Sequence, residues 1–314
     1  MKLQQLRYVR EVARQGLSIS DAAQTLHTSQ PGVSKQIRML EDELGVDIFM
    51  RNRNRVIEIT PAGKAMLPVA QRMLDDAENL KRLGQEFRQD RSGSLTVLTT
   101  HTQARYTLPQ VVKRFVARHP GIRLGLRQGT PNQIWQLVAN GEADLAIASE
   151  PRQALPDLVM LRCYELPRIA LTPPRHPLLR RKRLTLEALA GYPIITYDDE
   201  FVGHSKVQRA FEAQGLTPNL VLNAIDTDVI KAYVELGLGV AIVAKPAFDA
   251  RRDRNLRAID ASHLFESNTV YLGFRRNNYL RRYALDFIEM LVPQLNRKVV
   301  QSAIDAASAR AAAS

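Results

Sequence analysis

Hydrogen-bonding side chains gather at the start of one short amphipathic segment, residues 29–45, and their chemistry suits the base edges of DNA. Ser29 can cap a helix here, Pro31 fits its first turn, where a missing N–H costs nothing, and Gly45 can end it. Donor side chains lie off the apolar face, near the part of a recognition helix that meets base edges: Gln30, Ser34, Lys35 and Arg38. With Ser29 and Pro31 they form the predicted DNA-contacting set. A plain helical hairpin is the alternative for this pattern taken alone.

Three arginines follow at alternating positions, in a short basic loop between two apolar runs. Arg51, Arg53 and Arg55 separate residues 46–49 from residues 56–59, which is the pattern of a winged helix-turn-helix. Guanidinium groups spaced in this way can reach phosphates or the narrow minor groove. A solvated turn is the alternative, but beside a recognition helix we predict a DNA-contacting wing.

The residue types that enzymes need are scattered rather than grouped. The single cysteine, Cys163, excludes an internal disulfide and a cysteine zinc site. The six histidines show no metal-ligand spacing, and no glycine-rich phosphate loop is present in the sequence. We therefore predict no catalytic residues, no metal site and no cofactor. An enzyme is the less favoured class, and a binding protein the favoured one.

The net charge of +12 does not locate the nucleic-acid contacts. Residues 1–60 carry nine Lys/Arg and seven Asp/Glu residues, so their net charge is only +2. Surplus charge elsewhere usually marks a solvated face. No apolar run approaches a membrane span, and the amphipathic N-terminus lacks the apolar core of a signal peptide. We expect a cytoplasmic protein without a membrane partner.

Helices and a wing would position the DNA contacts within residues 1–60. Residues 2–15 form an amphipathic helix, and Ser18 can cap a second helix ahead of the tight turn that leads to residue 29. The apolar spacing of residues 33–44 gives the recognition helix its buried side. We therefore predict a winged helix-turn-helix DNA-binding domain.

A long helix is predicted next, within a linker that spans residues 61–92. Thr60 and Pro61 are a strong helix start, and the helix can run to about residue 87 before a hinge at residues 90–93. One narrow apolar stripe follows an a/d spacing, with Asp76 as its one interruption: Met66, Val69, Met73, Leu80, Leu83 and Phe87. Such a stripe would be exposed in a monomer, so we expect the same helix of a second subunit to cover it.

Strands and helices alternate from residue 94 onward, which predicts an α/β region of two similar lobes with a cleft between them. Lobe I would comprise residues of about 93–165 and 266–300, and lobe II residues of about 166–265. The Ala/Ser-rich end, residues 301–314, is expected to be a frayed helix or disordered. The fold class is therefore α+β and multidomain.

Several stretches resemble one family. The run AAQTLHTSQPGVSKQIRMLEDELGVDIF, followed by R-x-R and TPAG, resembles the N-terminal domain of LysR-type transcriptional regulators. GEADLAIAS, PPRHPL and LGLGVAIVA are similar to that family's effector domain. TTHTQARYTLP, MKLQQLRY and TDVIKAYVELGLGV resemble the CysB-like branch, which controls sulfur assimilation and cysteine biosynthesis. The resemblance implies a periplasmic-binding-protein-like effector domain over residues 93–300. It also implies double-stranded promoter DNA, further copies of the chain in a dimer or tetramer, and RNA polymerase as partners.

The resemblance also implies an effector site for sulfate, N-acetylserine or a similar small anion. Carried over residue by residue, its contacts would be Thr100, Thr102 and Gln103, with Ser149 in the place of a threonine and Val202 in the place of another. Ser149 keeps the hydroxyl and Val202 loses it, while residues 198–200 add three acids nearby.

The position of these residues agrees with that site. Residues 100–103 follow a strand and precede a helix, and Ser149 ends another strand. Backbone N–H groups, hydroxyls and an amide there favour a dehydrated anion without a full counter-charge. Ordinary strand-end capping is the alternative. His101 lies beside this site, where we expect it to orient the loop.

Two other functions fit parts of the chain. A LysR-type regulator of an unrelated pathway would have the same architecture and another effector. An exported solute-binding protein would suit the C-terminal two-thirds, but it would lack the DNA-binding segment and would carry a signal peptide.

Overall fold

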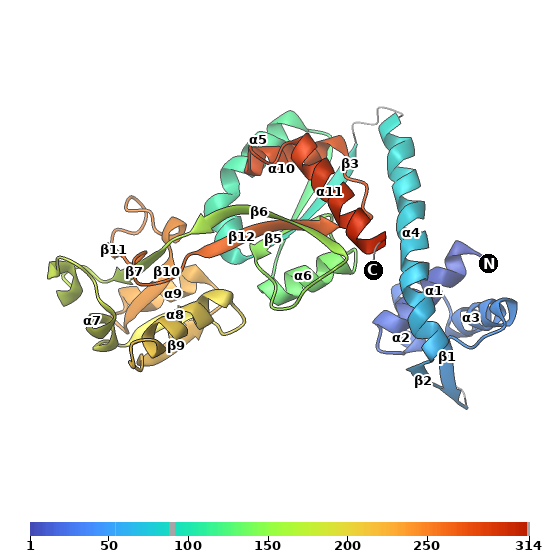
Figure 1. The fold of residues 1–314 in the computed structure, drawn as a ribbon, viewed down its shortest axis with the longest axis horizontal. Helices are drawn as coiled ribbons and strands as arrows, with labels where there is room; N and C mark the ends of the chain where they lie inside the picture. The colour runs from blue at the N-terminus through green and yellow to red at the C-terminus, as the bar shows by residue number, and fades with distance from the viewer. Residues whose placement is uncertain (54, 88–91, 313–314) are drawn as a thin grey trace. The chain divides into compact units, whose positions relative to one another are not determined.

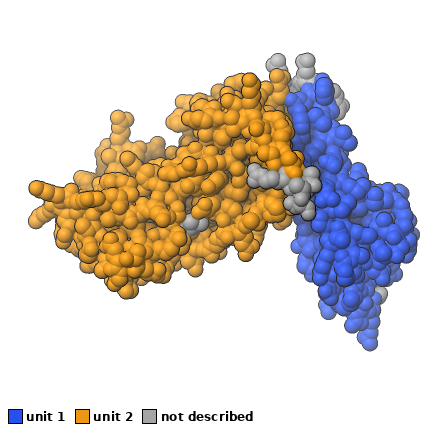
Figure 2. All heavy atoms as spheres, in the orientation of Figure 1, with its two compact units in different colours: residues 1–89, 277–279 blue, residues 90–276, 280–314 orange. Residues whose placement is uncertain are grey.

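The computed structural model describes residues 1–53, 55–87 and 92–312, and it divides into two compact units (Figure 2). Unit 1 comprises Met1–Gln89 with Asn277–Tyr279, and unit 2 comprises Asp90–Arg276 with Leu280–Ser314. Unit 1 holds the helical N-terminal part, and unit 2 holds both lobes of the α/β part (Figure 1).

Unit 1 begins with three short helices around one apolar core: α1 (Leu3–Arg14), α2 (Ile19–Thr25) and α3 (Gln30–Leu44). Ser18 caps α2 by accepting a hydrogen bond from the Asp21 N–H at 3.2 Å. Val12, Val33 and Ile37 are fully buried between the helices. The apolar spacing that predicts α3 therefore fixes which side of α3 faces solvent.

The wing is a two-stranded antiparallel hairpin of β1 (Phe49–Asn52) and β2 (Arg55–Ile59). Phe49 is buried in the helical core and pairs with Ile59, so the base of the hairpin is anchored. Arg53 adopts a left-handed conformation at the tip, with φ of 56°. The tip therefore extends away from an anchored base.

The linker helix α4 (Pro61–Phe87) starts at a capped end, where the Thr60 hydroxyl accepts a hydrogen bond from the Gly63 N–H at 2.9 Å. One side of α4 packs against the helical core, with Ala70 and Leu74 buried and Met66 and Met73 partly buried.

The expectation that the whole apolar stripe of α4 is exposed in a single chain is therefore wrong for Met66 and Met73. The helical core of the same chain covers part of each of these two side chains, because α1 packs against α4. Three stripe residues remain exposed, at 45%, 71% and 86% respectively: Val69, Leu80 and Phe87.

Lobe I of unit 2 is built on a mixed five-stranded sheet in the order β4-β3-β5-β12-β6. Its strands are β3 (Gly93–Thr99), β4 (Ile122–Gln128), β5 (Leu145–Ser149), β6 (Leu158–Leu166) and β12 (Asn268–Arg275). The pairs β3–β4 and β3–β5 are parallel, so the residues after β3 and β5 meet at the same edge. One face is covered by α5 (Pro109–Arg118), α10 (Arg282–Leu291) and α11 (Arg297–Ala312), and the other by α6 (Pro131–Ala139) (Figure 1).

Lobe II repeats this plan with a sheet in the order β11-β7-β10-β8-β9. Its strands are β7 (Arg168–Thr172), β8 (Ile194–Tyr197), β9 (Leu220–Ala224), β10 (Val240–Ala244) and β11 (Arg257–Asp260). α7 (Leu186–Ala190) and α8 (Val202–Glu212) cover one face, and α9 (Thr227–Glu235) covers the other. The chain passes between the lobes from β6 to β7 and returns before β12, where Leu166 and Asn268 are paired.

The C-terminal segment is helical, where the composition left a frayed helix or disorder open. It forms α11, which runs to Ala312. Val300 is buried in the core of lobe I, and Ala303, Ile304 and Ala307 pack against the same core. The small alanines allow close packing on the sheet, so α11 is a part of the lobe. None of the helices in the described ranges is long and apolar enough to cross a lipid bilayer.

Candidate DNA interface and effector site

The start of α3 presents the predicted DNA contacts to solvent. The Ser29 hydroxyl caps α3 by accepting a hydrogen bond from the Gly32 N–H at 3.3 Å. Ser34 is half-buried, and the other members of the set are exposed: Ser29, Gln30, Pro31, Lys35 and Arg38. Several donors thus share an exposed helix start, which is the geometry of direct base readout.

The three wing arginines have different surroundings. Arg53 and Arg55 are exposed at the tip of the hairpin. Arg51 instead donates to Glu41 at 2.7 Å, and that carboxylate is only 4% exposed. Glu41 also accepts hydrogen bonds from the backbone N–H groups of Ile48 and Phe49, at 2.9 and 3.1 Å. Arg51 therefore ties the wing to α3, a role that its place in a basic loop did not reveal.

The predicted effector residues meet at one cavity between the lobes, with a volume of about 30 Å³. Thr100, Thr102, Gln103 and Ser149 line it from lobe I. The remaining lining comes from lobe II and from the crossing segments: Leu166, Arg168, Tyr197, Phe201, Ala244, Asn268 and Val270. Val202 begins α8 directly after Phe201, but its side chain lies outside the described part of the structure. The three acids at residues 198–200 are not among the lining residues.

Hydrogen bonds hold the lobe I residues of this cavity in place. The Thr102 and Thr227 hydroxyl oxygens lie 3.1 Å apart, and the Tyr197 hydroxyl lies 3.0 Å from that of Thr227. The Tyr164 hydroxyl donates to Oε1 of Gln103 at 2.7 Å, so the NH₂ group of the amide is the part that can donate to a ligand. Thr102 therefore connects the cavity directly to α9 of the opposite lobe.

Arg168 is the cavity residue that the sequence did not reveal. Its side chain is fully buried, and none of its three guanidinium nitrogens has a hydrogen-bond partner among the described residues. The guanidinium carbon lies 5.6 Å from the centre of the Tyr197 ring. Burial lowers the pKa of Arg168, but an arginine starts so high that it stays charged. The expectation of an anion site without a full counter-charge is therefore wrong: the cavity contains one full positive charge.

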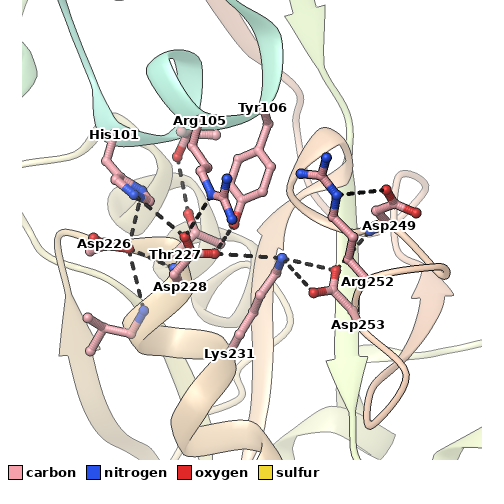
Figure 3. Close-up of polar contacts among 12 residues, drawn as sticks. His101, Arg105, Tyr106, Asp226, Thr227, Asp228, Lys231, Asp249, Arg252 and Asp253 are labelled. Atoms are coloured by element: carbon pink, nitrogen blue, oxygen red, sulfur yellow. Dashed lines mark hydrogen bonds and ion pairs between the residues drawn. The ribbon is translucent and has the colours of Figure 1, made fainter. Parts of the chain in front are cut away.

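A second polar cluster joins the lobes beside the cavity (Figure 3). We call it the interlobe network, and it consists of His101, Arg105 and Tyr106 from lobe I and Asp226, Asp228 and Lys231 from lobe II. Tyr106 donates to Asp228, and Arg105 donates to the same carboxylate at 3.2 Å (Figure 3). Lys231 also donates to Asp253, at 3.0 and 3.1 Å.

The charges of this network favour the ionised carboxylate. Burial by itself would raise the pKa of Asp228, but the hydrogen bonds from Tyr106 and Arg105, together with the positive charges of Lys231 and Arg105, outweigh it and leave the pKa lowered. Burial and the neighbouring Asp228 raise the pKa of Tyr106, so its hydroxyl remains a donor. The contacts therefore link the lobes around neutral pH.

His101, Asp226 and Asp228 also meet the distance requirement for a cation site, since their ligand atoms lie within 4.8 Å of one another. Both carboxylates are, however, occupied by donors of the protein. Asp226 caps α9 by accepting from the Asp228 N–H at 2.7 Å, and Asp228 accepts from Tyr106 and Arg105. The Nδ1 atom of His101 lies 3.2 Å from Asp226, in keeping with a role in orienting the loop. We therefore assign these residues to the interlobe network.

Comparison with known proteins identifies the two units. Residues 3–64 match the family described as bacterial regulatory helix-turn-helix protein, lysR family, and residues 88–296 match the LysR substrate binding domain. The chain belongs to the LysR family of transcriptional regulators. It is therefore a transcriptional regulator and not an enzyme, with a DNA-binding unit followed by a unit of the type that binds small-molecule effectors.

Similar regulators align over nearly the whole chain. SsuR of Burkholderia cenocepacia is 51% identical over 94% of this chain and 96% of its own length. CysB of the same species is 48% identical over 97% of both chains, and Cbl of Escherichia coli is 45% identical over 96% and 97%.

A solved structure supports the same assignment for the effector-binding unit. The cofactor-binding domain of the Cbl transcriptional regulator is 43% identical, covers 68% of this chain and 94% of its own, and superposes with a TM-score of 0.65.

Proposed function

We propose that this regulator controls genes of sulfur assimilation and cysteine biosynthesis in response to a small anion, such as sulfate or N-acetylserine, bound between the lobes. One observation supports the proposal that a small anion binds in this cavity. The cavity lining includes Thr100, Thr102, Gln103, Ser149 and Arg168, which can all donate hydrogen bonds, and no carboxylate is among its described residues. The similarity to SsuR, CysB and Cbl supports the pathway.

On the DNA side, the exposed start of α3 reads base edges, and Arg53 and Arg55 grip phosphates or the minor groove. Their exposure and their donor chemistry support these roles. Self-association uses α4, whose exposed residues Leu80 and Phe87 would be covered by a second copy. A dimer, or a tetramer built from dimers, then presents paired recognition helices to promoter DNA and to RNA polymerase.

The effector acts by changing how the two lobes of unit 2 meet. A ligand shifts such an equilibrium only by its different affinity for the two arrangements. Thr102 lines the cavity and also contacts Thr227 of α9, so a ligand that binds Thr102 also affects the interlobe contact. Such a ligand would favour one lobe arrangement over the other.

Genome-wide mapping of bound DNA tests the proposed function. Cells would be grown with sulfate and under sulfur limitation, and a variant with Lys35→Ala would serve as the DNA-binding control. The expected result is occupancy upstream of sulfur-uptake and cysteine-synthesis genes that changes with the sulfur source. Occupancy confined to other genes, unchanged by sulfur limitation, would favour a LysR-type regulator of an unrelated pathway.

A further inference from the structure

We propose that Arg168 is the charged anchor of the effector site, so that the cavity selects an oxyanion group and binds it through the guanidinium. This inference rests on the proposed effector site and names its decisive residue and ligand class.

The burial of Arg168 is the first argument. A buried charge is costly unless an opposite charge or several hydrogen-bond acceptors compensate for it. Arg168 is fully buried, and the described part of the chain supplies no acceptor to Nε, Nη1 or Nη2. The face of the Tyr197 ring offers a weak attraction and no hydrogen bond. The chain therefore keeps an uncompensated cation at the wall of a cavity.

The neighbours of Arg168 add to the excess of positive charge around its guanidinium. The Cβ of any residue at position 203 would lie 2.0 Å from Nη2 of Arg168, so Gly203 lets the first turn of α8 reach the guanidinium. The N-terminal end of a helix carries partial positive charge from its free N–H groups. Two positive groups thus meet at one point, which is unfavourable without an anion and favourable with one.

Asn268, which lies close to the same glycine, is neutral and does not compensate for the positive charge of Arg168. Its Nδ2 lies 3.0 Å from the same Cβ position, and its Oδ1 is buried with no donor from the part of the chain that the structure describes. The amide is neutral in either orientation, so it leaves the positive charge of Arg168 uncompensated. Arg168 therefore lacks a negatively charged partner at this cavity, and one more neutral acceptor would not replace it.

The ligand class follows from the shape and the donors. A planar guanidinium matches two oxygens of one oxyanion, as in a carboxylate, sulfate or sulfonate group. A volume of about 30 Å³ holds roughly two water-sized spheres, so it suits such a group and not a large molecule. A longer metabolite would place its oxyanion at Arg168 and extend the rest toward the cleft opening.

The test compares Arg168→Met with wild type in the full-length protein, using sulfate, thiosulfate and N-acetylserine as probes. Calorimetry gives the affinity, and thermal unfolding gives Tm with and without each probe. The exposed Arg180, replaced by methionine, is the matched control in the same lobe. Arg168→Lys keeps the charge without the two-pronged geometry.

Arg168→Met should weaken oxyanion binding by about tenfold to a hundredfold, the range for a lost hydrogen bond to a charged group. It should also raise the Tm of the ligand-free unit, because an apolar side chain removes the uncompensated charge. Arg168→Lys should bind with intermediate affinity, and Arg180→Met should behave like wild type. A purely structural arginine would give the opposite pattern, a lower ligand-free Tm with an unchanged probe-induced gain.

Two results would overturn the proposal, and they differ in what else they overturn. Unchanged oxyanion affinity in Arg168→Met would reject the role of Arg168 and leave the proposed function standing. Absence of binding by every probe to wild type would reject this proposal together with the anionic effector. The pathway would then depend on the DNA-mapping experiment alone.

Discussion

The contact between Arg51 and Glu41 leads to a prediction that separates folding from DNA binding within one loop. Replacement of Arg51 by alanine leaves a carboxylate that is 4% exposed without its cation. Breaking a buried pair costs about 3–5 kcal/mol. Arg51 is 17% exposed and Glu41 keeps two backbone donors, so we expect the lower end, about 3 kcal/mol. In a unit of this size, that lowers Tm by about 10 °C or more.

Differential scanning calorimetry of the full chain would follow the unfolding of unit 1, and DNA titrations over a salt series would follow phosphate contacts. The control is Arg53→Ala, at the exposed tip of the same hairpin. It should leave Tm within about 2–4 °C and flatten the salt slope by about one unit. Arg51→Ala combined with Glu41→Gln should recover part of the lost stability, because a neutral amide tolerates burial better.

One combination of results would contradict a structural role for Arg51. Arg51→Ala would have to unfold at the wild-type temperature and flatten the salt slope as much as Arg53→Ala does. Arg51 would then be a DNA contact, and its pairing with Glu41 would carry no structural weight.

The remaining predictions concern association, base readout, the effector cavity and pH. Leu80→Asp places a charge in the expected helix–helix interface and should give slower sedimentation as a smaller species; an unchanged oligomer would contradict the role of α4. Lys35→Ala should cost about 1–3 kcal/mol at one base position, and unaltered sequence preference in binding-site selection would reject base reading. Thr102→Val should weaken sulfate binding about tenfold or more, and calorimetry with wild-type affinity would exclude Thr102 from the site. Asp228 has a lowered pKa, so its stabilising contribution is complete above its ordinary value of 3.8 and is lost as the pH falls below it. The Tm difference between Tyr106→Phe and wild type should therefore stay constant above about pH 4 and shrink at lower pH, and a difference independent of pH would contradict this coupling.

Local signals in the sequence predict the helices of unit 1 well. Ser29 and Gly45 mark the two ends of α3, and Thr60 followed by Pro61 marks the start of α4, because caps depend on near neighbours in the chain. The confirmed parts also include the family, the two-lobed effector unit and the role as a regulator.

Features that depend on distant residues could not be predicted in the same way. Arg51 looked like its two neighbours in the wing because the burial of Glu41 is a property of the folded core. Met66 and Met73 share the spacing of Leu80, yet the core of the same chain partly covers them. Whether a stripe faces its own chain or another is decided by tertiary packing.

At the effector site, Arg168 could not be predicted for the same reason. A single arginine at the start of an apolar strand does not by itself indicate a binding residue. The surroundings of Arg168 are formed in part by Gly203 and Asn268, which lie far along the chain. The hydroxyl and amide residues were named only through a family resemblance. The contact of Val202 with the effector remains a prediction, because its side chain lies outside the described residues.

The pairing of Leu166 with Asn268 has a mechanical consequence. Both passages of the chain between the lobes run side by side at this point, so they define an axis about which one lobe can rotate relative to the other. Arg168 is two residues beyond Leu166. Rotation of one lobe about this axis would displace Arg168 little, because Arg168 lies only two residues beyond the pairing. The effect of a ligand bound to Arg168 on this rotation therefore depends on the contacts that cross between the lobes, such as that of Thr102 with Thr227 of α9.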